Sequence, residues 1–323
     1  MKKIGLLLLV VFASIALIGC NNSEFAVDGE FTAFEASVHT NGAQQVTMVS
    51  VIIQGGQIVG YNIDARQATR TQTAGADTPD DTSDDTYSFA WNAKTKKELG
   101  MDYGMVARGG AIAEWFVQAN RIEAAMLANG VDSITKNASN VIDNVAGVTI
   151  KDGGYLALAA EAVELAKAGK FQSIYCSGTD LYIGSMVVTP KGEVTELKLD
   201  TLQKKSVLAV KNTFEWNVKT KQELGNDYGM KGTGAAYTFA NGVWTASTTA
   251  KATLEWFEQA NLITNYVLST GQVYNLRSVG GRSISVDGST LVDGLAGVTI
   301  KTDAYLTVLT NLFANVAEGE IKK

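Results

Sequence analysis

The sequence predicts an α+β protein with two tandem copies of one domain, each a small antiparallel sheet packed with helices. Three observations lead to this class. Strand patterns with Gly-containing turns precede helical patterns in both halves of the chain. Strands and helices do not alternate as regular βαβ units do. Motifs recur in the same order, and 323 residues are enough for two domains.

Three motifs carry the repeat. They are Trp-Asn-x-Lys-Thr-Lys-x-Glu-Leu-Gly-x-Asp-Tyr-Gly-Met at 91–105 and 216–230, Glu-Trp-Phe-x-Gln-Ala-Asn at 114–120 and 255–261, and Asp-x-x-Ala-Gly-Val-Thr-Ile-Lys at 143–151 and 293–301. The separation between the copies grows from 125 to 141 to 150 residues. Growing separations exclude a solenoid of fixed period and indicate a tandem duplication with insertions in the second copy.

The elements follow one order in both copies. A hairpin comes first, at 51–64 and 187–200, followed by a short helix around Lys-Lys-Glu-Leu or its counterpart. Apolar residues at helical spacing then predict amphipathic helices at 111–127 and 254–268, and final helices at 155–168 and 305–316.

Two further expectations concern single features of this order. Trp115 and Trp256 lie on the apolar stripes of the amphipathic helices and are expected in the core, although stacking on a cofactor is the alternative. The stretch 71–86, with five Asp residues, is expected to be a solvated loop rather than a calcium site, because the spacing of an EF-hand is missing.

Residues 1–19 have the features of an export signal. Two lysines precede an apolar run of 15 residues, shorter than the roughly 20 that span a bilayer. The run ends in Leu-Ile-Gly-Cys, which resembles a bacterial lipobox. This predicts a lipoprotein signal peptide at 1–19, lipidation of Cys20 and a short tether at 20–29. The expected location is the extracellular face of a Gram-positive cell membrane, held by lipid.

Composition excludes several classes. With 27 Lys+Arg against 33 Asp+Glu the net charge is −6, which argues against a nucleic-acid partner. Two Cys and one His exclude zinc fingers and cysteine-ligated clusters, and no metal site is expected. Cys176 is expected to be a small core residue. A hydrolase built on His39 is disfavoured because the second copy has no matching His.

Thr149 and Thr299 are the candidate functional residues. Each follows a glycine, Gly147 or Gly297, whose missing Cβ lets a bulky group approach the backbone. Each also precedes a predicted helix, and the N–H groups of a helix start attract anions. This setting suits a phosphate ester on the threonine. The alternative is a plain turn that leads into a β-branched strand.

These loops resemble the flavinylation motif of the FMN-binding domains of Rnf and sodium-pumping Nqr complexes, which usually reads Asp-Gly-x-Ser/Thr-Gly-Ala-Thr. In that family a dedicated flavin transferase joins the phosphate of FMN to the last Thr. The resemblance implies FMN-binding domains at 30–169 and 170–323 with two covalent FMN groups. The residues it implies are Thr149 and Thr299 for attachment, Gly147 and Gly297 as motif glycines, and Asp143 and Asp293 as the acidic start.

The lipobox and the tandem units together resemble the PplA-type flavinylated lipoproteins of extracellular electron transfer. This implies a redox carrier rather than a stand-alone enzyme, which takes electrons from quinol-oxidising membrane components and passes them to soluble or mineral acceptors. Four residues that recur beside glycines are candidates for lining the flavin ring: Tyr103, Met105, Tyr228 and Met230. The alternative function is that of a solute-binding lipoprotein of a transport system.

Overall fold

The protein is described here by a computed structural model covering residues 24–76, 82–271, 273, 276, 278–279, 281–284, 295 and 297–322. The fold class is α+β, with antiparallel sheets and helices. The signal segment, Cys20 and Asp293 lie outside the described residues. Within the described ranges, no helix is both long and apolar enough to cross a membrane.

The first half of the chain forms a four-stranded sheet of order β1-β2-β3-β4 and its helices. The strands are β1 (Gly29–Val38), β2 (Gln44–Gln54), β3 (Gln57–Thr73) and β4 (Thr86–Trp91). The helices are α1 (Lys96–Leu99), η1 (Gly100–Tyr103), α2 (Met105–Gly109), α3 (Trp115–Asn129), η2 (Val131–Ser133) and α4 (Tyr155–Lys167).

The second half repeats this order around a three-stranded sheet. The repeated elements are β5 (Lys170–Ser177), β6 (Asp180–Val188), β7 (Val194–Leu202), α5 (Lys221–Leu224), η3 (Gly225–Tyr228), α6 (Trp256–Thr270) and α7 (Asp303–Ala314). Between them lie the hairpins β8 (Ala235–Ala240) with β9 (Val243–Lys251), and β10 (Ser278–Val279) with β11 (Arg282–Ile284).

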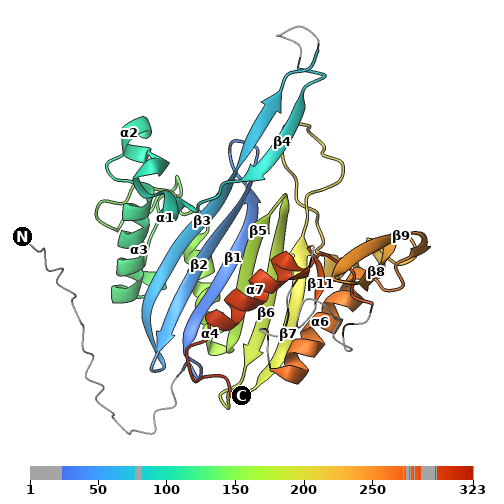
Figure 1. Ribbon diagram of the computed structural model, residues 1–323. Helices are drawn as coiled ribbons and strands as arrows, with labels where there is room; N and C mark the ends of the chain where they lie inside the picture. Colours follow the sequence, from blue (N-terminus) through green and yellow to red (C-terminus); the bar gives the residue numbers. More distant parts are fainter. Residues whose placement is uncertain are drawn as a thin grey trace, which may run out of the picture.

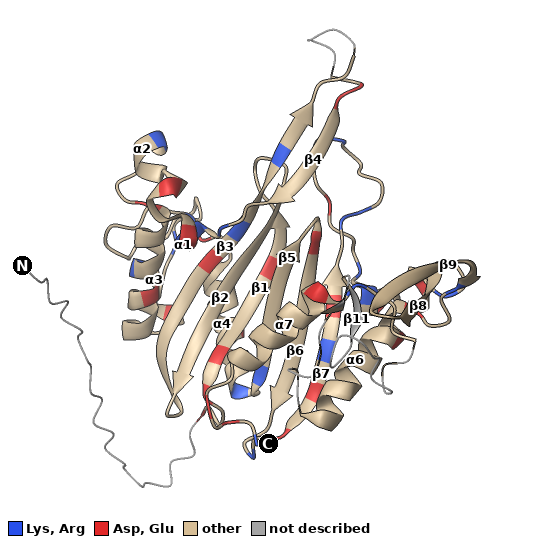
Figure 2. Ribbon diagram, viewed as in Figure 1, with Lys and Arg blue, Asp and Glu red and all other residues tan. Residues whose placement is uncertain are grey.

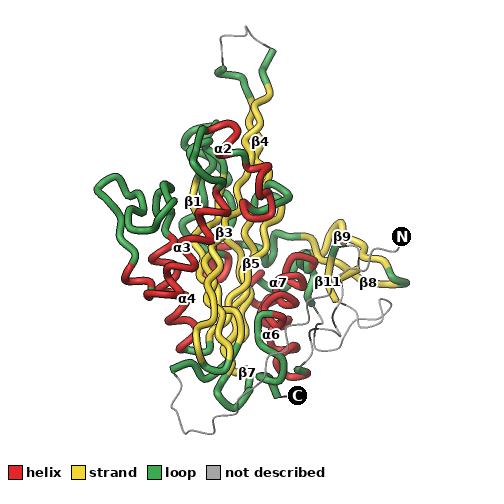
Figure 3. The backbone as a smooth tube through the Cα atoms, turned by 90° about the vertical axis from the view of Figure 1, so that its left-hand side faces the viewer, coloured by secondary structure: helices red, strands yellow, loops and turns green. Residues whose placement is uncertain are grey.

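The two sheets lie side by side, with β1 next to β5, and the helices cover opposite faces (Figure 1). Turned by 90°, the molecule shows α3 and α4 on one side of the strands and α6 and α7 on the other (Figure 3). Contacts repeat as well, since α3 packs on β3 as α6 packs on β7, and α4 covers β1 and β2 as α7 covers β5 and β6.

The hydrophobic core is continuous across the two halves. Phe31 on β1 and Phe171 on β5 are both fully buried and stack with ring centroids 4.1 Å apart. A second contact lies at the other end of the sheets, where Trp91 and Trp216, equivalent positions of the sequence repeat, have centroids 6.2 Å apart. One cluster of buried residues therefore takes in α3, α4, α6 and α7.

Local chemistry explains where these elements start and turn. Gly55 and Gly56 both have positive φ, 59° and 69°, which suits the tight turn between β2 and β3. The short helices α1 and α5 each begin with a capping box, Thr95 with Glu98 and Thr220 with Glu223.

Most predicted elements are confirmed with shifted ends. Both hairpins form, and the amphipathic helices begin at Trp115 and Trp256. The first strand of each sheet, β1 and β5, was not predicted. The expected loop at 71–86 was partly wrong where the structure describes it, since 77–81 lie outside the described residues. There β3 continues to Thr73, and Asp85 is buried and accepts a hydrogen bond from the backbone N–H of Gly75.

Charged residues of both signs are interspersed over strands and helices (Figure 2). This distribution agrees with the small net charge of −6.

The continuous core predicts that the two halves unfold together. Replacing Phe171 by Ala removes a fully buried ring from the junction of the sheets and is expected to cost about 3–5 kcal/mol. Val218→Ala, at a position 90% exposed, is the control and should stay within about 0.5 kcal/mol. Two separate transitions in denaturant unfolding, with only one moved by Phe171→Ala, would contradict this expectation.

Candidate functional site

Each threonine loop is held by one buried glutamine. The Oε1 of Gln118, on the first turn of α3, accepts the backbone N–H of Thr149 at 2.7 Å and that of Ile150 at 3.2 Å. In the second half, Oε1 of Gln259 accepts from the equivalent loop residues, Thr299 at 2.7 Å and Ile300 at 3.1 Å. Both glutamines are completely buried.

The threonine hydroxyls share the same acceptors. Thr149 Oγ1 lies 3.3 Å from Gln118 Oε1, and Thr299 Oγ1 lies 3.4 Å from Gln259 Oε1. The side-chain N–H₂ of each glutamine is turned back to its own helix start, donating to the carbonyls of Ala113 and Leu254. This fixes which amide atom faces the loop, because the oxygen alone can accept the loop N–H groups.

The N–H groups of a helix start near each threonine were expected to attract an anion. In the structure the N–H groups of the threonine and of the residue after it point at the glutamine oxygen. The start of α4 is also occupied, since Asp152 accepts from the N–H of Leu156 and pairs with Lys136 at 2.6 Å. The hydroxyl itself, rather than the loop backbone, remains the group that can join a phosphate.

The motif glycines adopt the left-handed backbone that favours glycine. Gly147 has φ 73° and Gly297 has φ 89°. A Cβ at Gly147 would lie 2.2 Å from the guanidinium of Arg121, which donates to the carbonyl of Gly147 at 2.6 Å. At Gly297 a Cβ would lie 3.1 Å from Leu254. Arg121 has no counterpart in the second copy, where Leu262 stands in its place.

The acidic residue at the start of the first motif, Asp143, bonds to the preceding segment rather than to the hydroxyl of Thr149. Asp143 is exposed and accepts from the Thr135 hydroxyl at 2.7 Å. Its neighbour Asn144 accepts from the backbone N–H of Thr135 and donates to Ser133. Asp143 therefore closes the segment that leads into the threonine loop.

The two threonines differ in exposure. Thr149 is exposed, whereas Thr299 retains only 8% of its surface. In this conformation Thr149 is accessible from solvent and Thr299 is largely covered.

The four candidate ring contacts lie against the same helix starts. Glu114 and Glu255, both buried, accept the backbone N–H of Met105 and Met230 at 2.8 Å each. The sulfur of Met230 lies 3.5 Å from Nε2 of Gln259. The structure thus brings the segments that carry Met105 and Met230 to the helices that hold the threonine loops.

Tyr103 and Tyr228 each belong to a lysine box. We use this term for a largely buried lysine whose ammonium lies between a tyrosine ring and a tryptophan ring. Lys96 Nζ lies 5.4 Å from the Tyr103 centroid and 5.2 Å from that of Trp115. The second box is made of Lys221 between Tyr228 and Trp256, at 5.0 and 5.3 Å. Burial lowers the pKa of both lysines to about 8.

Both tryptophans are buried, at 3% and 2% exposure, so the core assignment for Trp115 and Trp256 is confirmed. Sequence reasoning missed Gln118, Gln259, Lys96 and Lys221. All four lie inside the repeated motifs, and their recurrence was the available signal.

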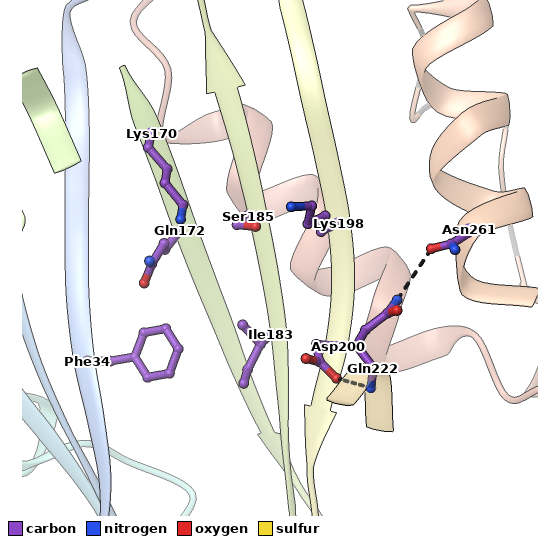
Figure 4. Close-up of a pocket in the computed structure, with 9 residues that line it drawn as sticks. All are labelled: Phe34, Lys170, Gln172, Ile183, Ser185, Lys198, Asp200, Gln222 and Asn261. Atoms are coloured by element: carbon purple, nitrogen blue, oxygen red, sulfur yellow. Dashed lines mark hydrogen bonds between the residues drawn. The ribbon is translucent and has the colours of Figure 1, made fainter. Parts of the chain in front are cut away.

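Each sheet also carries a shallow pocket, and the two pockets lie at equivalent strand positions of the two halves. One of about 450 Å³ lies over β5, β6 and β7 and includes Lys170, Lys198 and Asp200 (Figure 4). The other, of about 310 Å³, includes Asp64, the counterpart of Asp200. Small-molecule sites are mostly apolar with few polar groups. The lining here is rich in charged and amide side chains, so these pockets do not favour the solute-binding alternative.

The structure also shows the surroundings of the thiol of Cys176 and the imidazole of His39. Cys176 is buried, as expected, and burial raises the pKa of its thiol to about 12. His39 accepts from the N–H of Asn41, and burial lowers its pKa. In the part of the chain that the structure describes, no three His, Cys, Asp or Glu side chains are grouped to hold a metal ion.

Comparison with known proteins adds little. No protein-family model matches the chain, and none of the curated proteins compared with it matches either. A solved structure that it resembles is the solution NMR structure of a structural-genomics target from Clostridium thermocellum. That structure is 23% identical with a TM-score of 0.26, and the match covers 43% of this chain and 91% of that one.

Removing the glutamine oxygen should release the threonine loop. Gln118→Met keeps the side-chain length but leaves the N–H groups of Thr149 and Ile150 without this partner, at an expected cost of about 1–3 kcal/mol for each group that stays buried. Amide hydrogen exchange should then accelerate at Thr149. Gln118→Glu retains an acceptor and should exchange more slowly than Gln118→Met. Equal exchange in the two variants would show that the oxygen does not hold the loop.

The lysine boxes should make stability depend on alkaline pH. Because the folded pKa of about 8 lies below the ordinary 10.5, the unfolded chain binds more protons between these values. Stability should rise with pH across this window, by at most about 1.4 kcal/mol per pH unit for each lysine.

The double variant Lys96→Met with Lys221→Met lacks both ammonium groups. Its unfolding midpoint in denaturant should therefore not rise with pH in this way. The difference between the two proteins isolates the lysines from the tyrosines, some of whose pKa values are raised by burial. A constant difference from pH 8 to 10.5 would contradict the assignment.

Proposed function

We propose that this chain is a membrane-anchored extracellular carrier that relays electrons through two covalently bound FMN groups, one on Thr149 and one on Thr299. The observation that carries the proposal is the repeated site itself, in which a buried glutamine fixes a threonine hydroxyl beside a left-handed glycine in both halves. The same arrangement in both halves gives two equivalent attachment points.

The residues present fit a phosphate ester on the threonine oxygen. Thr149 is exposed, its backbone is tied down by Gln118, and Gly147 keeps the loop in a conformation unfavourable for other residues. In the attachment step Oγ1 of the threonine would form a bond to the FMN phosphorus of FAD, the bond to AMP would break, and the hydroxyl proton would pass to the transferase. AMP is then the leaving group and no electrons are exchanged.

The bound flavin would supply the redox chemistry, accepting electrons from quinol-oxidising membrane components and passing them to soluble or mineral acceptors. The chain's own residues bind and orient it. The glutamines hold the attachment points, and the segments carrying Tyr103, Met105, Tyr228 and Met230 lie next to them. Lipid on Cys20 would keep the carrier at the membrane. A covalent cofactor is not lost by diffusion outside the cell.

Mass spectrometry of the protein made with its flavin transferase tests this function. We expect FMN-sized additions on the peptides that contain Thr149 and Thr299, and none in the variant Thr149→Ala with Thr299→Ala, which should fold but stay colourless. The natively produced protein without any covalent flavin would contradict the proposal.

The difference in exposure predicts an order of attachment. Thr149 should be modified first, because Thr299 is only 8% exposed and must be uncovered before a transferase can reach it. Time-resolved peptide mass spectrometry should show the Thr149 adduct ahead of the Thr299 adduct. The single variants Thr149→Ala and Thr299→Ala serve as controls for the two rates.

A further inference from the structure

The two lysine boxes are the least explained feature of the molecule. Lys96 and Lys221 are each 9% exposed, and throughout 24–76, 82–271 and the described residues beyond them neither ammonium makes a hydrogen bond or an ion pair. An ammonium carries three donors, and placing it on a largely buried side chain without acceptors costs free energy. The more distant carboxylates, Asp64 near Lys96 and Asp180 and Asp200 near Lys221, only partly offset this cost. Two aromatic faces compensate only part of that cost.

A purely structural role does not require a cation there. An apolar side chain of similar length would fill the space between the rings without the desolvation cost. The neighbouring position shows the contrast. Lys97 pairs with Glu123 at 2.5 Å, yet its counterpart in the second half is Gln222. The box lysine, which has no such partner, is present in both halves.

Each lysine box lies one helix turn from the glutamine that holds the threonine loop. Trp115 forms one wall of the first box, and Gln118, three residues further on α3, holds Thr149. Residues three apart on a helix have Cβ atoms about 5–6 Å apart. In the second half Trp256 and Gln259 repeat this spacing. The ribityl phosphate chain of FMN is longer than one helical turn of about 5.4 Å.

We propose that Lys96 and Lys221 are the cations that bind the pyrimidine edge of the flavins attached to Thr149 and Thr299, and that they favour the reduced flavin. This inference rests on the proposed function. Uptake of two electrons from the quinol-oxidising partner and one proton leaves one negative charge on the N1 and C2 carbonyl side of the ring. An ammonium that lacks an acceptor in the protein can donate to both atoms and pair with that charge.

The test uses proteins that carry a single flavin, verified by intact mass. In the Thr299→Ala background, Lys96→Met should lower the midpoint potential of the remaining flavin measured by spectroelectrochemistry. Each tenfold loss in the relative stability of the reduced form corresponds to about 30 mV for a two-electron couple. Lys94→Met, at an exposed position two residues away, should leave the potential unchanged. Lys96→Arg keeps the charge and should retain more of the potential than Lys96→Met.

The second half supplies the reciprocal control. In the Thr149→Ala background, Lys221→Met should lower the potential and Lys96→Met should not. An equal potential in Lys96→Met and Lys94→Met, in protein that carries FMN on Thr149, overturns the inference and leaves the proposed function intact. A failure to attach FMN at all contradicts the proposed function instead.

A measurement that needs no substitution at the lysine tests the inference even if the lysine variants fail to fold. The pKa of Lys96, followed by NMR of labelled lysine side chains, should rise when the flavin is reduced, because the new negative charge favours the ammonium. The same measurement on the protein without flavin gives the reference. A pKa that is unchanged by reduction also overturns the inference.

Discussion

The oxygen of a buried amide determines the geometry of both sites. Gln118 and Gln259 each accept two backbone N–H groups of a threonine loop, and no water is needed to satisfy them. The loop therefore cannot leave the helix start without breaking both hydrogen bonds, at a cost of about 1–3 kcal/mol for each donor left buried and unpaired. The glutamine thus ties an irregular segment, and the threonine hydroxyl on it, to the helix start.

The other repeated polar groups also lie at the starts of α3 and α6. Glu114 and Glu255 tie the segments before α3 and α6 to those helices, while Trp115 and Trp256 form one wall of each lysine box. The halves place these helices on opposite faces of the strands, so the two sets lie on opposite sides of the sheets (Figure 3). Both halves thus repeat a largely buried lysine one helical turn from a threonine loop.

The sequence predicted the elements with clear periodicity and missed the interactions that make the site. Helices α3 and α6 followed from apolar spacing, and the hairpins from Gly-containing turns. Strand β1 was missed because its turn to β2 lacks the short Gly pair found between β2 and β3. Gln118 lay inside a recognised motif, but burial of a polar side chain depends on a loop 31 residues away. Lys96, next to a second lysine, has the pattern of a solvated pair.

The placement of the two sites constrains how electrons could pass between them. Helices α3 and α6 pack on β3 and β7, each the third strand of its half counted from the β1–β5 junction (Figure 1). Followed along the strands, the path from β3 to β7 through β2, β1, β5 and β6 is about 24 Å at roughly 4.8 Å per step. Under the proposed function, each flavin would exchange electrons with partners at its own face of the strands. The protein would then act as two separate electron-transfer sites on one lipid anchor.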